Sequence, residues 1–323
     1  MNKCIGCGAI IQNDNPDILG YSPKKDAKYC ERCFRVKHYS EVKLVSLPKE
    51  QEDLINIINE KSNFVLFLVD VLNITEKVIE TFKKLKTNKI LVINKVDTFP
   101  KSLRKESVIN HLRNYYKIED KIIFASAIKG YGIKEIKNII LENNYTYLVG
   151  YTNSGKSSLI NRLKKEMGNN EVITTSIIPN TTIDFIKIKL DNNYIIDSPG
   201  FMYDSSIYNN DNLNLIKKTN IKNRINPITY QIKENDKVLI EDFMEISVDS
   251  RNSFTFYMSN NLKVKKIYKE YLCDLNSKIY EIKENQDLII KGLGFINIKK
   301  PSKLKIFIED QNLIEIRDSI IGK

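Results

Sequence analysis

The sequence predicts an α/β domain with a mostly parallel sheet, between a small cysteine module and a mainly β (α+β) C-terminal domain. From residue 50 to about 205, short apolar runs alternate with amphipathic stretches, a pattern typical of strands and helices that cover both sheet faces. Four of the five cysteines lie in two pairs before residue 34. After residue 205 the helical pattern gives way to short β-like runs. The predicted units are residues 1–45, 46–208 and 209–323.

The apolar runs of the central unit are expected to form strands, and the amphipathic stretches are expected to form helices. The expected strands are Phe64–Asp70, Ile90–Asn94, Ile122–Ala125, Tyr145–Gly150, Ile183–Leu190 and Tyr194–Asp197. The expected helices are Thr75–Leu85, Ser102–Tyr115, Ile133–Glu142 and Lys156–Glu166. The polar segment Asn209–Asn214 is expected to be a linker. The expected C-terminal strands are Lys237–Ile240, Phe254–Met258, Asp287–Ile290, Phe295–Ile298 and Leu304–Ile308, and no internal repeat is apparent.

Composition favours an intracellular protein with a polyanionic partner. The net charge is +11 and the pI is near 9.1, which favours nucleic acid, although a general bias toward Lys, Asn and Ile would give the same balance. Met1 leads to Cys4 without an apolar leader, and the apolar run Phe64–Val69 is too short to span a bilayer. We therefore expect a soluble, cytoplasmic protein with no membrane partner.

The segment from Gly150 to Ser157 fits the P-loop pattern Gly-x4-Gly-Lys-Ser, after an apolar strand and at the start of a helix. In such a loop, backbone N–H groups and the helix N-terminus surround phosphates. Lys156 is expected to neutralise the β- and γ-phosphates, and the Ser157 hydroxyl to bind Mg²⁺. The predicted phosphate contacts are Gly150, Asn153, Ser154, Gly155, Lys156, Ser157 and Ser158.

A second phosphate-side motif, Asp197-Ser198-Pro199-Gly200, also follows a strand. Asp197 is expected to hold Mg²⁺ through water, and the Gly200 N–H to meet the γ-phosphate. Between the two motifs lies Pro179-Asn180-Thr181-Thr182, where Thr182, or Thr181 as second choice, would close on Mg²⁺. Phe201 occupies the position after Gly200 where many GTPases have a water-orienting Gln, which predicts slow intrinsic hydrolysis.

A base-reading motif, Asn94-Lys95-Val96-Asp97, follows an earlier strand. The Asp97 carboxylate can accept two N–H bonds from guanine, Asn94 can bind the far edge of the base, and the Lys95 stem can lie over its plane. Adenine would leave Asp97 without a donor. Ser126-Ala127 adds backbone support after the next strand. Together the motifs predict binding of GTP and GDP.

The order of these motifs is unusual, because the base-reading half precedes the phosphate-binding half. An ordinary GTPase begins with its P-loop, and a circular permutation would give the order seen here. The segment after Gly200 then leads directly into the C-terminal domain, so the state of the nucleotide could reach that domain mechanically.

The cysteine pairs Cys4-x2-Cys7 and Cys30-x2-Cys33 form a four-thiolate set suited to tetrahedral Zn²⁺, with iron as the chemical alternative. The metal is expected to fold the module without taking part in catalysis. Lysines, arginines and aromatic residues surround the pairs, which fits a nucleic-acid surface or a protein-docking face. Cys273 is expected to be a small buried residue.

With these motifs, the chain resembles the YqeH family of circularly permuted GTPases. Three features give the resemblance: the cysteine module with Gly20-Tyr21-Ser22-Pro23, the permuted motif order, and the C-terminal signature Gly292-Leu293-Gly294-Phe295. The resemblance implies a GTPase with a zinc module that assists assembly of the small ribosomal subunit and binds its rRNA in one nucleotide state. Asn153 resembles the Asn of GTPases that bind an activating K⁺. Asn180, Ser154 and the segment Asp70–Thr75 depart from the family pattern.

Two further interpretations stay open. One is a zinc-containing RNA-binding adaptor that uses the nucleotide only as a structural or regulatory ligand; the intact Lys156, Ser157 and Asp197 argue against it. The other is a GTPase that acts on tRNA or a membrane receptor. Two lysine clusters in the C-terminal domain are candidates for RNA contact: Lys263, Lys265, Lys266 and Lys269, and Lys299, Lys300, Lys303 and Lys305.

Overall fold

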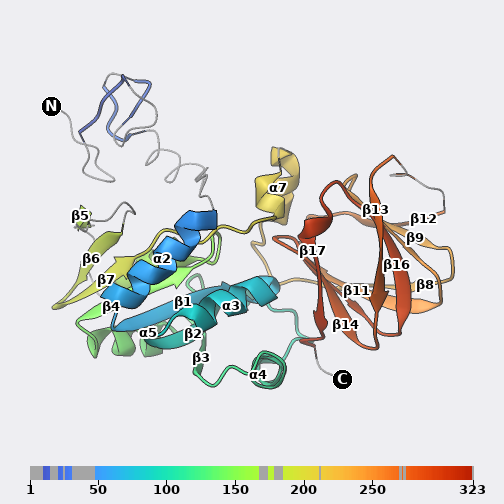
Figure 1. The fold of residues 1–323 in the computed structure, drawn as a ribbon, viewed down its shortest axis with the longest axis horizontal. Helices are drawn as coiled ribbons and strands as arrows, with labels where there is room; N and C mark the ends of the chain where they lie inside the picture. Colours follow the sequence, from blue (N-terminus) through green and yellow to red (C-terminus); the bar gives the residue numbers. More distant parts are fainter. Residues whose placement is uncertain are drawn as a thin grey trace.

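The protein is described by a computed structural model that covers residues 10–14, 21–24, 26–30, 48–166, 174–177, 185–210, 212–268, 271 and 274–321. Figure 1 shows a helix-covered sheet on the left and two packed C-terminal sheets on the right. The helices in the described ranges all fall short of the length and apolar content needed to cross a membrane.

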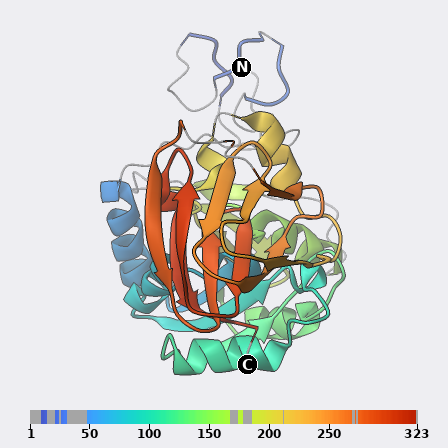
Figure 2. The ribbon, with the colours of Figure 1, turned by 90° about the vertical axis from the view of Figure 1, so that its right-hand side faces the viewer.

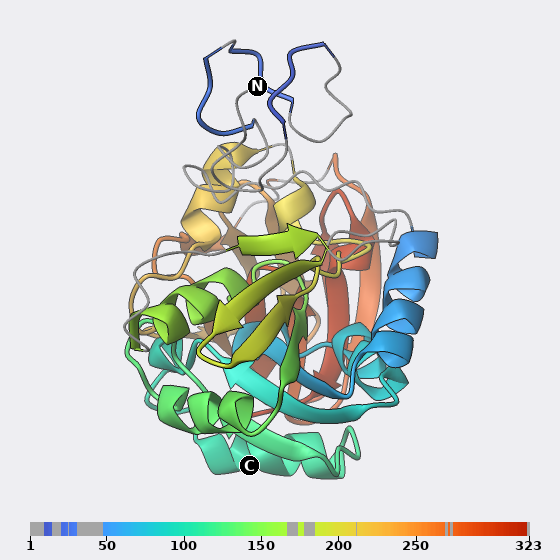
Figure 3. The ribbon, with the colours of Figure 1, turned by 90° about the vertical axis from the view of Figure 1, so that its left-hand side faces the viewer.

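The central sheet has seven strands in the order β3-β2-β1-β4-β7-β6-β5. Its strands are β1 (Phe64–Asp70), β2 (Asn88–Asn94), β3 (Lys121–Phe124), β4 (Tyr145–Gly150), β5 (Thr174–Ile177), β6 (Ile186–Leu190) and β7 (Asn193–Asp197). The pairs from β3 to β7 are parallel, whereas β6 and β5 add to the edge in antiparallel fashion. The expected mostly parallel sheet is therefore present, and Figure 3 views it from the side opposite the C-terminal sheets.

Helices cover both faces of this sheet. They are α2 (Pro48–Lys61), α3 (Glu76–Lys84), α4 (Lys105–Asn114), α5 (Ile133–Leu141) and α6 (Lys156–Glu166). Buried residues of α2, α3 and α4 share one hydrophobic cluster, and those of α5 and α6 share another on the opposite face. Burial of these apolar stripes, worth roughly 25 cal/mol per Å², is what holds the layers together.

Two helices and the edge strand β5 were not expected. Helix α2 carries Leu54, Ile55 and Ile58 at helical spacing, and all three are buried. Helix α7 (Leu213–Thr219) occupies part of the segment expected to be a linker, and the Asn212 side chain caps its first turn. A polar sequence can therefore be an ordered helix when caps satisfy its free N–H groups.

The C-terminal region is two five-stranded sheets packed face to face. The first has the order β12-β9-β10-β16-β13 and the second has the order β17-β14-β15-β11-β8. The strands are β8 (Ile228–Ile232), β9 (Lys237–Ile240), β10 (Met244–Val248), β11 (Asn252–Met258), β12 (Val264–Ile267), β13 (Ser277–Ile282), β14 (Gln286–Ile290), β15 (Gly294–Ile298), β16 (Ser302–Phe307) and β17 (Ile314–Asp318). The mainly β prediction is confirmed for this region.

The expectation of no internal repeat is wrong. Ile232-Lys233-Glu234-Asn235 recurs as Ile282-Lys283-Glu284-Asn285, a spacing of 50 residues that also relates the strands that follow. The strands β8 to β12 of the first repeat correspond in order to β13 to β17 of the second. When each strand is exchanged for its counterpart, the strand order of one sheet becomes the strand order of the other. Each sheet takes three strands from one repeat and two from the other. Few identical residues remain between the repeats, so the relation is clear only in the pairing of the strands.

The second C-terminal sheet packs on the layer of the central sheet and its helices (Figure 1). Tyr257, Ile289 and Phe295 belong to the same hydrophobic cluster as the residues of β1 and α3. Arg317 is buried, pairs with the buried Asp287 at 3.4 Å and donates to the carbonyl of Ile74. The two parts therefore share a core and a buried polar network.

Candidate nucleotide site

The predicted site residues meet at one edge of the central sheet. Neighbouring parallel strands β3, β2, β1, β4 and β7 end at, or one to two residues before, Ser126, Asn94, Asp70, Gly150 and Asp197. Because parallel strands end at the same edge, motifs from distant parts of the sequence become neighbours there. The permuted order of the motifs therefore leaves their arrangement in space intact.

The P-loop backbone has no room for side chains at its two glycines. A Cβ on Gly150 would lie 2.4 Å from the Leu68 carbonyl oxygen, and one on Gly155 would lie 2.3 Å from Asn94 Nδ2; both glycines have positive φ. Ser157 and Ser158 open the helix α6 with exposed side chains. The Ser154 hydroxyl is buried without a hydrogen-bond partner among the described residues. The loop thus presents backbone and hydroxyl groups of the kind that bind phosphate.

Lys156 lies folded back on this loop. Its Nζ donates to the Gly150 carbonyl at 2.7 Å. Burial lowers the pKa of Lys156 to about 8, and the nearby Asp197 charge opposes that shift. An anion in the loop would favour the charged ammonium in the same way, because opposite charges stabilise each other at short range.

Asp197 and the turn after it face the same loop. Burial raises the pKa of Asp197 to about 6, against the charges of Lys156 and Lys164, and its Oδ1 has no hydrogen-bond partner in the described part of the chain. A buried carboxylate oxygen without a partner fits a cation site. Ser157 and Asp197 are the described residues that would hold Mg²⁺, which neutralises phosphate charge when bound.

Gly200 lies against Lys156, since a Cβ there would be 3.2 Å from Nζ. The next residue, Phe201, is 1% exposed and packs between Phe67 and Tyr151. Its N–H donates to Gly150 O, and its own carbonyl accepts from Thr152 N. Phe201 therefore joins the Gly200 turn to the P-loop from the core side, with its ring buried between Phe67 and Tyr151.

Base-reading residues are held by the strand ends and by each other. The Ser126 hydroxyl donates to Asp97 Oδ1 at 2.6 Å, which fixes the carboxylate and leaves Oδ2 available. Asn94 donates through Nδ2 to the Ser154 carbonyl at 2.9 Å, so it ties the base-reading half to the P-loop. Its Oδ1 is buried without a partner among the described residues. Ala127 follows at 9% exposure.

Lys95 makes a contact that the sequence does not suggest. Its Nζ pairs with Asp70 Oδ2 at 2.9 Å, and Asp70 lies at the end of β1. Burial would lower the pKa of Lys95, but the Asp70 carboxylate outweighs it and the pKa is raised. The signal for Asp70 is a carboxylate directly after a fully apolar strand, although its partner depends on the strand order.

A second unexpected residue is Tyr208. Burial raises the pKa of its hydroxyl, opposed by the Lys95 charge and by a hydrogen bond with the Asn153 side chain. Tyr208 belongs to the segment that follows the Gly200 turn. It therefore connects the P-loop, through Asn153, with the start of the C-terminal region.

Several predicted residues lie outside the described part of the chain. They are Thr181, Thr182, Cys4, Cys7, Cys33 and Cys273. Of the predicted zinc ligands only Cys30 is described, and it is buried. The described ranges contain no group of three metal-ligating side chains, so the zinc site stays a prediction.

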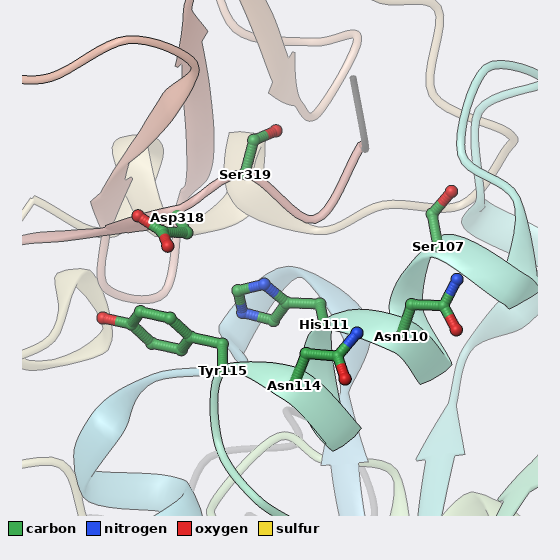
Figure 4. A pocket seen from close by; sticks show the side chains of 7 residues that line it. All are labelled: Ser107, Asn110, His111, Asn114, Tyr115, Asp318 and Ser319. Carbon is green, nitrogen blue, oxygen red and sulfur yellow. The ribbon is translucent and has the colours of Figure 1, made fainter.

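A separate hollow lies between α4 and the end of β17, away from these motifs (Figure 4). It is lined by Ser107, Asn110, His111, Asn114, Tyr115, Asp318 and Ser319. His111 stacks on Tyr115, and burial followed by the Arg317 charge lowers its pKa to about 3. This hollow has none of the phosphate- or base-binding groups.

The chain is similar to known GTPases over most of its length. Residues 47–204 match the family described as RsgA GTPase, and residues 145–286 match the one described as 50S ribosome-binding GTPase. The protein YqeH of Bacillus subtilis is 30% identical over 344 residues, which cover 93% of each chain. The chain belongs to the YqeH family of circularly permuted GTPases. The expected family, the permuted P-loop fold and the GTPase activity are thereby confirmed.

More distant similarities cover about half of this YqeH-family GTPase. A protein of Flavobacterium psychrophilum named small ribosomal subunit biogenesis GTPase RsgA is 28% identical over 164 residues, or 48% of this chain and 50% of that protein. The crystal structure of YjeQ from Thermotoga maritima aligns with a TM-score of 0.32 at 25% identity, over 44% of this chain and 49% of that one.

Proposed function

We propose that this GTPase is a nucleotide-driven switch that assists assembly of the small ribosomal subunit by binding the pre-ribosome or its rRNA in one nucleotide state. The observation that carries the proposal is a single turn of the C-terminal region, Lys291–Gly292–Leu293, which is linked to each half of the nucleotide site through one intermediate contact. A GTPase that only hydrolysed nucleotide would not need such a connection.

The first contact runs to the base-reading half. The Gly292 N–H donates to Asn73 Oδ1 at 2.9 Å, and Asn73 Nδ2 lies 3.5 Å from Asp70 Oδ2. Asp70 in turn holds Lys95. A displacement of this turn would therefore change the position of a residue that is expected to lie over the base.

The second contact runs to the phosphate half. Ile207 N donates to the Lys291 carbonyl at 3.0 Å, and a Cβ on Gly292 would lie 3.1 Å from Tyr208 Cε2. Tyr208 bonds to Asn153 of the P-loop. Gly292 has φ +86°, so only glycine fits this approach without strain.

The names of relatives supply the biological setting. RsgA proteins of Flavobacterium psychrophilum and Caldanaerobacter subterraneus are both named small ribosomal subunit biogenesis GTPases. The family matched by residues 145–286 is described by binding to the 50S ribosome instead. We favour the small subunit because two relatives carry that name in full, and the net charge of +11 suits an RNA-rich partner.

The proposed switch follows the general scheme of GTPases. In the triphosphate state Thr182 and the Gly200 turn close on Mg²⁺ and the γ-phosphate, and hydrolysis releases them. Residues 205–210 follow the Gly200 turn and contact the Lys291–Leu293 turn. Release of the Gly200 turn after hydrolysis would therefore shift the position of the C-terminal sheets relative to the GTPase part. We further propose Cys4, Cys7, Cys30 and Cys33 as zinc ligands, Asn153 as a candidate K⁺ contact, and the three predicted units as domains.

The test is co-sedimentation of the full chain with purified small ribosomal subunits in GDP, GTP and a non-hydrolysable GTP analogue. We expect binding in one nucleotide state, and loss of that dependence in Lys156→Ala. Lys165→Ala, an exposed lysine of the same helix, is the matched control. Asn73→Ala removes the acceptor of the Gly292 N–H together with the longer 3.5 Å bond from Asn73 to Asp70. It leaves the Asp70–Lys95 pair in place, so we expect it to bind nucleotide yet to lose the nucleotide dependence of subunit binding.

Equal binding in every state, with single-turnover hydrolysis no faster than in Lys156→Ala, would support an RNA-binding adaptor instead. Binding to large subunits alone would reject the small-subunit assignment while leaving the switch in place. Absence of binding to either subunit would reject a ribosomal role.

A further inference from the structure

The two repeats of the C-terminal region present equivalent outer faces, and among the described residues only one of these faces packs on the GTPase part. On the second sheet, Arg317, Asp287 and Asn297 lie side by side across three strands and form a buried network, with Asn297 Nδ2 donating to Asp287 Oδ1 at 2.9 Å. Phe295 and Tyr257 beside them belong to the core shared with the GTPase part. This face is occupied by the rest of the chain.

The equivalent row on the first sheet is chemically different. Register places Ile267, Lys237, Ser247, Lys305 and Ile279 directly across from one another on five adjacent strands. Lys237 stands at the position of Asp287, and Lys305 at the position of Thr255, 50 residues apart in each pair. In the first repeat, Ile267 and Lys237 therefore occupy the positions of the buried Arg317–Asp287 pair, and Lys305 adds a second lysine to the row.

This second face, which we call the open face, is partly exposed to solvent. Its row from Ile267 to Ile279 is half-buried or exposed, whereas Leu239, Glu245 and Phe307 in the next row are buried. Ile279 is 62% exposed, and the side chains of Lys303 and Glu281 are 62% and 78% exposed in a loose pair at 3.5 Å. Lys305 is also exposed, and its Nζ lies 4.9 Å from the centre of the Phe307 ring beneath it. Figure 2 views the C-terminal sheets from the side that carries this face.

Aromatic side chains border the open face. Tyr268 follows Ile267 at the end of β12 and is 83% exposed. Tyr271 is 57% exposed, and its N–H donates to Glu245 Oε2 at 2.9 Å. Glu245 is buried under that contact. Solvent-exposed tyrosines beside lysines give a surface with rings for bases and ammonium groups for phosphates.

We propose that the open face binds single-stranded RNA. Lys237, Lys265, Lys303 and Lys305 supply four positive charges on this face, against Glu281, the covered Glu245 and the exposed Asp249. The Asp249 carboxylate is engaged by the backbone N–H of Lys303 at 3.0 Å. Neighbouring strands of a sheet are about 4.8 Å apart, so the lysines of β12 and β9 are separated by one such step and those of β9 and β16 by two, with Ser247 of β10 between them. Long lysine side chains at these spacings can follow a phosphate backbone. Exposed Ile279 and the two tyrosines offer surfaces for unstacked bases, which a duplex would keep hidden.

The inference rests on the proposed function, because it names the surface through which this switch meets its RNA. The docked face of the two C-terminal sheets contacts the GTPase part and moves with its nucleotide state, and the open face binds the RNA. The same sandwich therefore joins the two events without a flexible connection between them.

The test uses the full chain and a fluorescein-labelled single-stranded RNA of mixed sequence, followed by anisotropy at several salt concentrations. Lys303→Gln with Lys305→Gln is expected to weaken RNA binding about tenfold and to reduce the salt slope by roughly 1.4, the value for two phosphate contacts on a single strand. Lys83→Gln with Lys84→Gln, two exposed lysines of α3, makes the same charge change elsewhere and is expected to leave both values unchanged.

Tyr271→Ala separates stacking from charge. It is expected to weaken RNA binding several-fold without changing the salt slope, because it removes a ring and no charge. GDP affinity serves as the check that each variant is folded.

An unchanged RNA affinity in the Lys303 and Lys305 variant, or an equal loss in the α3 control, would overturn the proposal. If that variant kept its RNA affinity but lost small-subunit binding, the open face would contact a ribosomal protein instead, and the RNA proposal would fail. In either case nucleotide-dependent sedimentation of the unmodified chain would leave the proposed switch standing.

Discussion

At the scale of single residues, the site combines groups that the sequence names with groups that only the fold brings together. Lys156, Asp97 and Asp197 are recognisable because each follows a strand in a fixed spacing of residue types. Asp70 and Tyr208 are not, because their roles depend on Lys95 and Asn153, which lie far away in sequence. Motifs record contacts with the nucleotide, whereas contacts among the motifs depend on tertiary structure.

Ser126 illustrates such a supporting contact. Its hydroxyl donates to Asp97 Oδ1, and a hydrogen bond to a charged group is worth about 1.5–3 kcal/mol. We expect Ser126→Ala to weaken GDP binding about tenfold, as measured by calorimetry. Inosine diphosphate lacks the amino group that Asp97 would accept from, so its affinity should fall less. Equal losses for both nucleotides would contradict a role in positioning Asp97.

His111 predicts a pH dependence of stability. Its pKa is about 3 in the folded protein, against 6.5 when unfolded, because it is buried near Arg317. The unfolded chain therefore binds the extra proton first, and folding stability is complete above pH 6.5 and falls toward pH 3, by about 1.4 kcal/mol per pH unit. Urea denaturation of His111→Asn should show a flatter curve in this window. Parallel curves for both proteins would rule the effect out.

At the scale of elements, the strands that the sequence predicts most accurately are those that are most deeply buried. β1 and β4 begin and end where their apolar runs do, because every residue after the first is buried against helices on both sides. β13 is an edge strand with exposed Ser277, Lys278 and Ile279, and its sequence carries too weak an alternation to be predicted. Edge strands obtain their conformation from the neighbouring strand more than from their own residues.

The turn after β7 gives an element-scale prediction. Phe201 packs against Phe67 and Tyr151 and is 1% exposed, so Phe201→Gln would bury an amide without partners and lose apolar contact. We expect a loss of about 3 kcal/mol or more of unfolding free energy and no acceleration of GTP hydrolysis. Thermal denaturation and single-turnover hydrolysis are the measurements; Phe201→Leu is the milder control. Faster hydrolysis by Phe201→Gln would show that the ring can leave the core.

At the scale of the whole molecule, the shared core joins the GTPase part to the C-terminal sheets. Motif order predicts the permutation and the short path into the C-terminal region, but not which face of the sandwich would dock. That choice rests on Phe295 and Arg317 in the second repeat, where the first has Glu245 and Ile267. Which face docks cannot be predicted from the diverged repeats, because the difference lies in only two or three side chains.

Arg317 carries the prediction at this scale. It is 1% exposed, its partner Asp287 is fully buried, and it also donates to the Ile74 carbonyl of the GTPase part. Removing one partner of a buried ion pair costs about 3–5 kcal/mol, because the other charge remains unpaired. Arg317→Met should therefore lower unfolding free energy by that amount. The double variant Arg317→Met with Asp287→Asn should recover part of the loss, and no recovery would mean that the contact with Ile74 dominates.

The exchange of strands between the repeats has a consequence for synthesis. β11 is made early, yet its neighbour β15 lies in the second repeat, and β10 likewise needs β16. During synthesis, β10 and β11 of the first repeat therefore each lack one neighbouring strand until residues near Phe307 have left the ribosomal exit tunnel. Pairings over such distances in sequence form slowly. The sandwich that couples nucleotide to partner is thus among the last parts to be completed, so the newborn chain cannot act as a switch until it is nearly whole.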